Sequence, residues 1–299
     1  MSAAISDSFA TLLRRIQPVA SEVRARHSHA GTIRQAVRGE FSAFNRLEVF
    51  GSHTRDTAVH IWSDVDYLAV LGKDDVTRGG GRVRSTATLF RLRKALAARF
   101  GGYGTKVKVR TPAVVVEFGR GKGAVDVVPA VWAGTGPRDG YPVFVMPDGR
   151  GGWSRTSPQR HAKFIKDEDA RARGKLSSTA QLLKAWKYGR RLPVPIHGFH
   201  LELLLASEGI CLGARSYAEC VADALVLLRD RSGRALRDPL GIASSIRVAG
   251  TDAKRRDVVS ATALAAGRAL RAVRLDARGR TEQARRLWNL VFGKSFPAR

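Results

Sequence analysis

The segment from Val49 to Leu71 constrains this chain most, because it places two carboxylates in a run that otherwise favours a buried strand. Asp64 and Asp66 are spaced i, i+2, so on a strand both side chains lie on the same face. The neighbours that indicate an internal strand are Val65, Leu68, Val70 and Leu71. An unpaired charge is costly in such a strand, and a metal ion is the simplest partner for two acids.

Two further elements complete a candidate site for nucleotidyl transfer. Gly51 and Ser52 form a turn before the acids, and a Gly-Ser turn can hold phosphate. Asp126 lies inside the apolar run AVDVVPA. If its strand pairs beside the Asp64–Asp66 strand, three carboxylates converge and can bridge two divalent ions about 3.5–4 Å apart. Asp126 would then help take the proton of the attacking hydroxyl. The alternative is that each acid pairs with one of the many arginines.

Length and composition limit the class of protein. The chain has 299 residues, of which 44% are hydrophobic, and this predicts about two domains with a substantial core. No apolar run reaches the ~18 residues of a membrane span, and the N-terminus lacks the pattern of a secretory signal. Cys211 and Cys220 are the only cysteines and lack zinc-site spacing. We therefore expect a cytoplasmic protein with no membrane association.

The net charge of +26, from 52 basic and 26 acidic residues, has two interpretations. One is an arginine-biased surface on a protein that handles polyanionic nucleotides, and the other is a nucleic-acid-binding footprint. Candidate contacts for RNA or DNA are Arg14, Arg15, Arg24, Arg26, Arg268, Arg271 and Arg274. On composition alone, these arginines are equally explained as solvated helix faces.

The hydrophobic pattern predicts an α+β chain with the order helix, mixed sheet, helical lobe. We expect helix over 7–45 and 86–99, and strands over 47–50, 65–71, 106–110, 113–118 and 124–128. Residues 133–152 are rich in Gly and Pro and are expected to be loop. Helices are expected over 177–190, 199–207, 217–229, 258–274 and 281–291. The expected domains are 1–150 and 151–299, with a cleft between them.

The motifs resemble those of the bacterial cGAS/DncV-like nucleotidyltransferases, called CD-NTases, within the polymerase-beta-like superfamily. The Gly-Ser turn with three aspartates specifies only the superfamily, and the downstream motifs narrow it to the family. The resemblance covers nearly the whole chain, from about residue 47 to 297. The matching motifs are GSHTRDTAVHIWSDVD, VDVVPA, the PDGRGGWSRTSPQRH stretch from Pro147 to His161, LLKAWK, FHLELL and VFGKSFP.

The resemblance implies a polymerase-beta-like core with a mixed sheet, an N-terminal spine helix and a C-terminal helical lobe. It implies an enzyme that joins nucleoside triphosphates into cyclic di- or trinucleotides and releases pyrophosphate, using two Mg²⁺ or Mn²⁺ ions. The resemblance implies that the substrates are ATP, GTP or both, and it also allows pyrimidine triphosphates. The product would be a second messenger in antiphage defence that activates a separate effector protein.

Site residues follow from the resemblance by position. Gly51 and Ser52 would hold the triphosphate, and the metal ligands would be Asp64, Asp66 and Asp126. Lys184 would reach the phosphates from the helical lobe, and Phe199 would stack on a base. Without the resemblance, Lys184 is equally a solvent-facing lysine and Phe199 is more simply a core residue. Many relatives have a serine just before the aromatic position, whereas this chain has Gly198.

Two other functions share these motifs. A template-independent nucleotidyltransferase that makes linear oligonucleotides would use the same metal site. A nucleic-acid sensor, whose catalysis depends on an RNA or DNA activator, would use the basic surface. The three intact aspartates argue against a sensor that has lost its chemistry.

Overall fold

The computed structural model describes residues 1–19, 24, 28–60, 62–102, 104–119, 123–136 and 139–297. The chain divides into two compact units, each built from separate stretches of sequence. The helical unit contains Met1–Gln17, Arg55–His60 and Lys163–Arg299, and the sheet unit contains Pro18–Thr54 and Ile61–Ala162. The single domain boundary expected between residues 150 and 151 stays a prediction.

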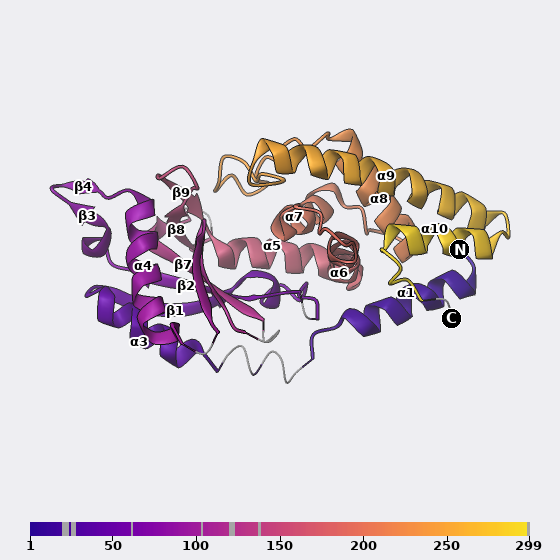
Figure 1. The fold of residues 1–299 in the computed structure, drawn as a ribbon. Coiled ribbons are helices and arrows are strands. Elements are labelled where there is room, and N and C mark those ends of the chain that lie inside the picture. The colour runs from indigo at the N-terminus through magenta and orange to yellow at the C-terminus, as the bar shows by residue number, and fades with distance from the viewer. Residues whose placement is uncertain are drawn as a thin grey trace. The chain divides into compact units, whose positions relative to one another are not determined.

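The sheet unit is organised around a mixed sheet in which seven strands pair within the described residues (Figure 1). Its main path is β1-β2-β7-β6-β5, and β8 pairs with both β7 and β9. β2 and β7 are parallel, and the other described pairs of this sheet are antiparallel. The strands are β1 (Phe44–Phe50), β2 (Val65–Leu71), β5 (Lys106–Arg110), β6 (Ala113–Glu117), β7 (Ala124–Thr135), β8 (Pro142–Pro147) and β9 (Trp153–Thr156). The short strands β3 (Thr77–Arg78) and β4 (Gly81–Arg82) pair separately.

Alternation along β2 and β7 gives the sheet two different faces. Two helices, α3 (Ala30–Glu40) and α4 (Ser85–Phe100), pack with one face through a shared apolar cluster. Tyr67 and Val127 belong to that cluster, whereas Leu68 and Val128 belong to a second cluster with Phe144. Since side chains alternate along a strand, the acids of β2 and β7 share the face of the second cluster. We call it the carboxylate face.

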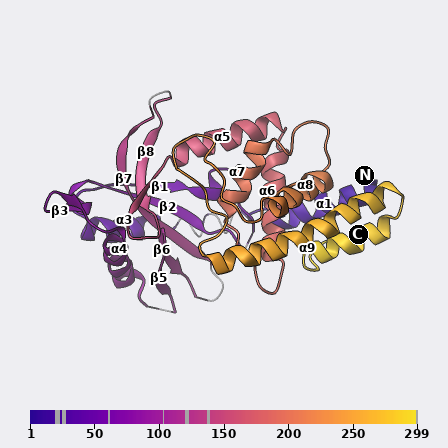
Figure 2. The ribbon, with the colours of Figure 1, turned by 90° about the horizontal axis from the view of Figure 1, so that it is seen from above.

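The helical unit consists mainly of helices. These are α1 (Ala3–Ile16), α6 (Lys175–Tyr188), α7 (Gly198–Glu208), α8 (Tyr217–Asp230), α9 (Asp252–Ala277) and α10 (Thr281–Val291), together with most of α5 (Pro158–Arg171). Ser216 and Glu219 form a capping box at the start of α8, which satisfies two backbone donors. The long helix α9 runs beside α10 (Figure 2). Within the described part of the chain, no helix combines the length and apolar character needed to cross a membrane.

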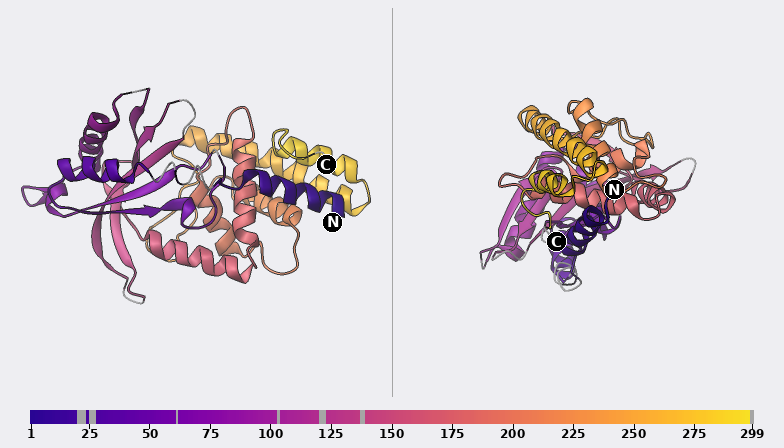
Figure 3. Two further views of the ribbon diagram at one scale, coloured as in Figure 1. Left: turned by 90° about the horizontal axis from the view of Figure 1, so that it is seen from below. Right: turned by 90° about the vertical axis from the view of Figure 1, so that its right-hand side faces the viewer.

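Aromatic side chains join the N-terminal helix to the C-terminal one. Phe9 on α1 is fully buried and meets Trp288 of α10 edge-on, with ring centroids 5.0 Å apart. Figure 3 shows that the N- and C-termini lie at the same end of the helical unit. Phe292 and Phe296 follow α10, and their ring centroids lie 5.9 and 5.0 Å from that of Phe9. Edge-to-face pairs of this kind add to the stabilisation from apolar burial. The two chain ends are therefore held in one cluster.

The α+β class and the mixed sheet expected from sequence are confirmed, with differences in particular elements. The expected helix over 7–45 is interrupted, because Gln17 is extended and ends α1. Pro18 follows, and a residue before proline is disfavoured in the helical region. The loop expected over 133–152 is wrong in part, because β7 continues to Thr135 and β8 occupies Pro142–Pro147. The apolar run VFV pairs with β7 and overrides the local Gly and Pro content.

Phe9→Ala should lower the free energy of unfolding by about 3–5 kcal/mol, because it removes a fully buried ring from the aromatic cluster. Urea denaturation followed by circular dichroism measures the change. The matched control is Phe90→Ala on α4, whose residue is 60% exposed, and its change should stay within about 0.5 kcal/mol. Equal losses in both variants would contradict the importance of the cluster.

Candidate functional site

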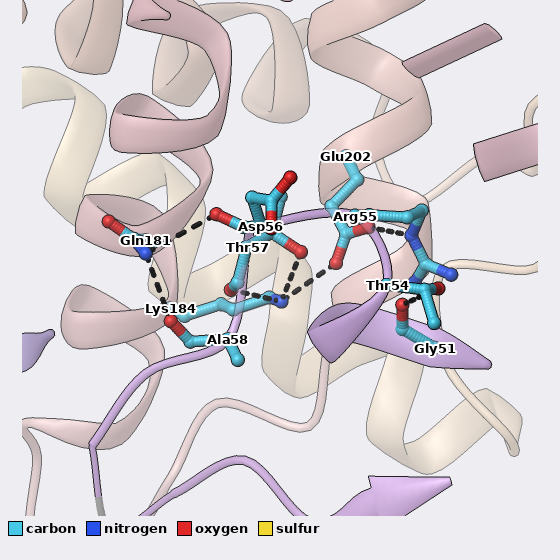
Figure 4. Close-up of polar contacts among 9 residues, drawn as sticks. All are labelled: Gly51, Thr54, Arg55, Asp56, Thr57, Ala58, Gln181, Lys184 and Glu202. Atoms are coloured by element: carbon cyan, nitrogen blue, oxygen red, sulfur yellow. Dashed lines mark hydrogen bonds and ion pairs between the residues drawn. The ribbon is translucent and has the colours of Figure 1, made fainter. Parts of the chain in front are cut away.

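The turn after β1 requires glycine for two reasons. Gly51 begins a short 3₁₀ turn (Gly51–His53) and has a φ of 84°, a conformation that side chains disfavour. A Cβ atom at this position would also lie 1.9 Å from Oδ2 of Asp66. The hydroxyl of Thr54 donates to the Gly51 carbonyl at 3.0 Å and closes the turn (Figure 4). The backbone of the turn therefore passes directly against the Asp66 carboxylate, with Ser52 as its second residue.

Strand register brings two of the predicted acids together. Asp66 on β2 is directly opposite Asp126 on the parallel strand β7. Neighbouring strands lie about 4.8 Å apart, and residues opposite each other point to the same face. Asp64 precedes β2 by one residue, and its charge acts on Asp126. The sheet thus places two of the three predicted acids, Asp66 and Asp126, on one face, and Asp66 lies against the Gly51 turn.

Asp126 has a strongly raised pKa. Burial first, and then the charge of Asp64, raise its pKa to about 7. The Arg110 guanidinium opposes this shift, while Glu117 adds to it. Its Oδ1 is buried and accepts no hydrogen bond from the residues that the structure describes. A buried carboxylate oxygen of this kind needs a cation or a proton.

These residues fit a hard divalent cation by donor type, since carboxylate oxygens are the ligands that Mg²⁺ prefers. The orphaned Oδ1 of Asp126 and the adjacent Asp66 supply such oxygens. Across the described residues, no group of three or more His, Cys, Asp or Glu side chains already stands in a metal-binding arrangement. The backbone therefore aligns the acids, while the ligand set itself stays a prediction.

Lys184 and Phe199, the two candidates from the helical lobe, belong to the helical unit. Lys184 on α6 is only 4% exposed, so it is not the solvent-facing lysine considered above. Its Nζ donates to the Thr57 carbonyl at 2.7 Å and to the Thr57 hydroxyl at 3.2 Å. The same Nζ lies 2.7 Å from Oε1 of Glu202 on α7 (Figure 4). Lys184 thus anchors the Arg55–His60 segment to the helices.

Arg55 and Glu202 form the rest of this buried ionic network. Arg55 donates through Nε to Oε2 of Glu202, and both side chains are almost fully buried. Burial raises the pKa of Glu202, but the charges of Arg55 and Lys184 outweigh burial and hold this pKa at about 2. Sequence reasoning did not select either residue as functional. The available signal was an acid within the apolar run FHLELL, which needs a cation when buried.

Phe199 and Gly198 are both explained by contacts with the network. The Arg55 guanidinium lies 5.1 Å from the centroid of the Phe199 ring, a cation–π distance. A Cβ atom at Gly198 would lie 3.2 Å from Cε of Lys184. The absence of a side chain at this position therefore leaves room for the buried lysine.

Of the arginines proposed as nucleic-acid contacts, five lie on helices of the helical unit, Arg24 belongs to the sheet unit, and Arg26 lies outside the described residues. Arg14 and Arg15 are exposed in the last turn of α1. On α9, Arg268 donates to the Leu290 carbonyl, while Arg271 and Arg274 are exposed. Arg24 is exposed. Their role toward RNA or DNA stays a prediction.

Gly51→Ala should destabilise the protein more than the same substitution at a glycine that also has a positive φ but has no neighbouring atoms near its Cβ position. Gly79→Ala is the matched control, because Gly79 also has a positive φ of 58° but has no atom within 4 Å of the point where a Cβ would lie. The control should lose roughly 1–2 kcal/mol from backbone strain. Gly51→Ala should lose about 1–3 kcal/mol more, because the methyl group meets Asp66. Urea denaturation measures both, and equal losses would show that the close approach is not essential.

Glu202→Gln should lower the free energy of unfolding by about 3–5 kcal/mol at neutral pH, because it leaves Arg55 and Lys184 buried without a counter-charge. The folded-state pKa of about 2 lies below the ordinary 4.5. The carboxylate therefore contributes fully above pH 4.5, and its contribution is lost as the pH falls toward 2.

Denaturation curves at pH 7, 5, 4 and 3 should show a wild-type advantage that shrinks below pH 4.5. Glu208→Gln is the control, because Glu208 forms a partly exposed pair with Arg231 at 3.3 Å, and such pairs contribute at most about 1 kcal/mol. A constant difference across this pH range would mean that the carboxylate charge is not what stabilises the network.

Comparisons with known proteins agree with this geometry. Residues 3–169, more than half of the chain, match the family model of the Second Messenger Oligonucleotide or Dinucleotide Synthetase domain. The matched stretch includes Gly51, Ser52 and the three acids. No curated protein sequence matches the chain.

Solved structures share the fold at low sequence identity. E. coli MS115-1 CdnC, solved with ATP, is 20% identical over 98% of both chains, with a TM-score of 0.68. Bradyrhizobium diazoefficiens CD-NTase CdnG, solved in complex with GTP, is 12% identical over 98% of both chains, with a TM-score of 0.64. Vibrio cholerae DncV cyclic AMP-GMP synthase, solved with the linear intermediate 5′ pppA(3′,5′)pG, is 14% identical over 100% of this chain and 92% of that one, with a TM-score of 0.61.

The family match and the shared fold confirm the resemblance drawn from the motifs. The chain belongs to the Second Messenger Oligonucleotide or Dinucleotide Synthetase family and is a bacterial CD-NTase, a nucleotidyltransferase.

Proposed function

We propose that this enzyme joins nucleoside triphosphates into a cyclic di- or trinucleotide and releases pyrophosphate. The observation that carries the proposal is the parallel pairing of Asp66 with Asp126, directly beside the Gly51 turn. This pairing supports a site in which a triphosphate and an attacking hydroxyl meet on the carboxylate face. Membership of the synthetase family supports the cyclic product.

In this proposal, Asp64, Asp66 and Asp126 hold two Mg²⁺ or Mn²⁺ ions. When bound, such ions neutralise phosphate charge and lower the pKa of an attacking hydroxyl. The turn at Gly51 and Ser52 holds the triphosphate through backbone N–H groups and the Ser52 hydroxyl. Because Gly51 contacts Asp66, the turn fixes the triphosphate against the acids.

Asp126 is the carboxylate best suited to accept the proton of the attacking hydroxyl. Without a bound cation its pKa is about 7, and a divalent ion lowers this pKa, so that the carboxylate is ionised at neutral pH and can accept a proton. Its Oδ1 is buried and accepts no hydrogen bond from the described residues, so it is available to a substrate proton or to a cation.

Two residues of the helical unit have proposed roles in nucleotide binding. Phe199 stacks on a base, and its ring is already oriented by the Arg55 guanidinium. Lys184 acts toward the phosphates, and its contacts with Thr57 and Glu202 mean that any direct phosphate contact must exchange one of them. Gln181 donates to the Ala58 carbonyl at 3.0 Å and holds the same segment (Figure 4).

The wider biological role follows from the family. We propose ATP, GTP or both as substrates, because structures of similar fold were solved with ATP and GTP. The product would activate a separate effector in antiphage defence, and an RNA or DNA activator would act through the basic helix faces. One structure of similar fold is a complex of CdnC with a HORMA protein, so regulation by a protein partner is an alternative to nucleic acid.

The catalytic assignment is tested with all four radiolabelled nucleoside triphosphates and Mg²⁺ or Mn²⁺. The double variant Asp64→Asn, Asp66→Asn should lose product formation by at least about 10³-fold, because it removes two anionic ligands of the proposed ions. EDTA should have the same effect on the wild type. The matched control is Asp74→Asn, Asp167→Asn, which changes two exposed aspartates and should keep full activity.

Phosphatase treatment identifies the kind of product. A cyclic product has no terminal phosphate and resists the phosphatase, whereas a linear oligonucleotide loses its terminal phosphates. Omitting one triphosphate at a time identifies the bases that are joined. Equal product from the wild type and the Asp64, Asp66 variant would refute the site, and a wholly phosphatase-sensitive product would refute cyclisation.

A further inference from the structure

The edge strand β5 carries a row of basic side chains that has no assigned role. Its sequence KVKVR alternates Lys106, Lys108 and Arg110 with two valines. The three basic residues are exposed and the valines are half-buried, so the basic side chains share one face of the sheet. We call these three residues the β5 basic row.

Register places the β5 basic row on the carboxylate face. Lys108 is opposite Val115 on β6, Val115 is opposite Asp126 on β7, and Asp126 is opposite Asp66 on β2. Residues opposite one another point to the same side of a sheet, so Lys108 and the two acids lie on one line across it. Two strand spacings separate β5 from β7, which is about 10 Å. The influence of the Arg110 charge on Asp126 is consistent with this arrangement.

Glu117 on β6 is the only acid paired with the row in the described part of the sheet. Its carboxylate accepts from Lys108 Nζ at 2.8 Å and lies 3.2 Å from Arg110 Nη2. The side chains of Lys108 and Arg110 remain 51% and 65% exposed. Exposed ion pairs contribute little, so an incoming anion can replace Glu117 at small cost. Three cations against one carboxylate also leave an excess of positive charge.

The position of the β5 basic row relative to the acids indicates which ligand it binds. The Gly51 turn follows β1, on one side of the β2–β7 pair, whereas the row lies on the other side. Under the proposed nucleotidyl transfer, the triphosphate of one nucleotide would lie at the turn and the hydroxyl of a second nucleotide would reach Asp126. The β5 side of the carboxylate face would then be open to the 5′-triphosphate of the second nucleotide.

We propose that the β5 basic row binds the 5′-triphosphate of the acceptor nucleotide, the one whose hydroxyl attacks. This inference rests on the proposed nucleotidyl transfer at Asp64, Asp66 and Asp126. Lys106 to Arg110 spans about 13 Å, which is long enough to contact all three phosphates of one triphosphate. Arg and Lys donors to phosphate form charge-assisted hydrogen bonds, which are stronger than neutral ones.

The binding test uses inorganic tripolyphosphate and isothermal titration calorimetry, with EDTA present to remove divalent ions. Lys108→Gln, Arg110→Gln should weaken binding about tenfold, since it removes two charged donors. Glu117→Gln should tighten binding, because it removes the competing carboxylate. The matched control is Lys94→Gln, Arg99→Gln on α4, which removes the same charge from exposed positions and should bind like the wild type.

The kinetic test separates substrate binding from chemistry. In the Lys108, Arg110 variant, KM for the triphosphates should rise about tenfold while kcat stays within about twofold of the wild type, because the contact is made in both ground and transition states. The control variant should keep both constants. Unchanged tripolyphosphate affinity and KM in the Lys108, Arg110 variant would overturn the inference. A variant that binds duplex RNA more weakly than the wild type, but binds tripolyphosphate with the same affinity, would overturn it as well.

The outcome also distinguishes this inference from the proposed function. If the wild type makes product and the Lys108, Arg110 variant matches it in KM, the row is not a subsite although the site is correct. If the wild type makes no product with any triphosphate, the proposed nucleotidyl transfer itself fails. A tighter complex with Glu117→Gln, together with a weaker one for the double variant, would establish the row.

Discussion

The parallel pairing of β2 with β7 is the constraint on which the rest of the site depends. It sets Asp66 opposite Asp126, and a shift of one residue would turn one of them to the helix-covered face. The apolar residues that flank the acids along β2 and β7 fix this register, because each of them belongs to one of two separate clusters on opposite faces of the sheet. Core packing and the alignment of the carboxylates are therefore one structural property. Substitutions in either cluster will act on the site through the register.

The glycine of the turn adds a second constraint of the same kind. Gly51 is needed for its positive φ and for the contact with Asp66, so the turn and the carboxylate are mutually positioned. Electrostatics then follows from geometry. Asp126 is buried beside other acids, and its raised pKa is the result. A site that concentrates negative charge in this way favours cations. A bound cation lowers the pKa of the carboxyl groups, which then release their protons.

Much of this arrangement was predictable from local sequence. The bounds of β2 and β5 match the expected strands, because alternation and β-branched residues are strong local signals. The β8 strand was missed because Gly and Pro dominate its surroundings, and only pairing with β7 reveals it. The same limit applies to Lys184. Its partners, Thr57 and Glu202, are far from it in sequence, so no local pattern indicates that its amine holds a backbone segment.

The buried network of Arg55, Lys184 and Glu202 has a consequence for how this sequence can change over time. One carboxylate neutralises two cations, and the three residues come from distant parts of the chain. Replacing Glu202 first leaves two uncompensated charges in the interior, whereas replacing one cation first leaves the other still paired. Divergence at these positions is therefore ordered, and the acid is the last of the three that can be exchanged. The network acts as an epistatic unit, in which the tolerance of each position depends on the residues already present at the other two.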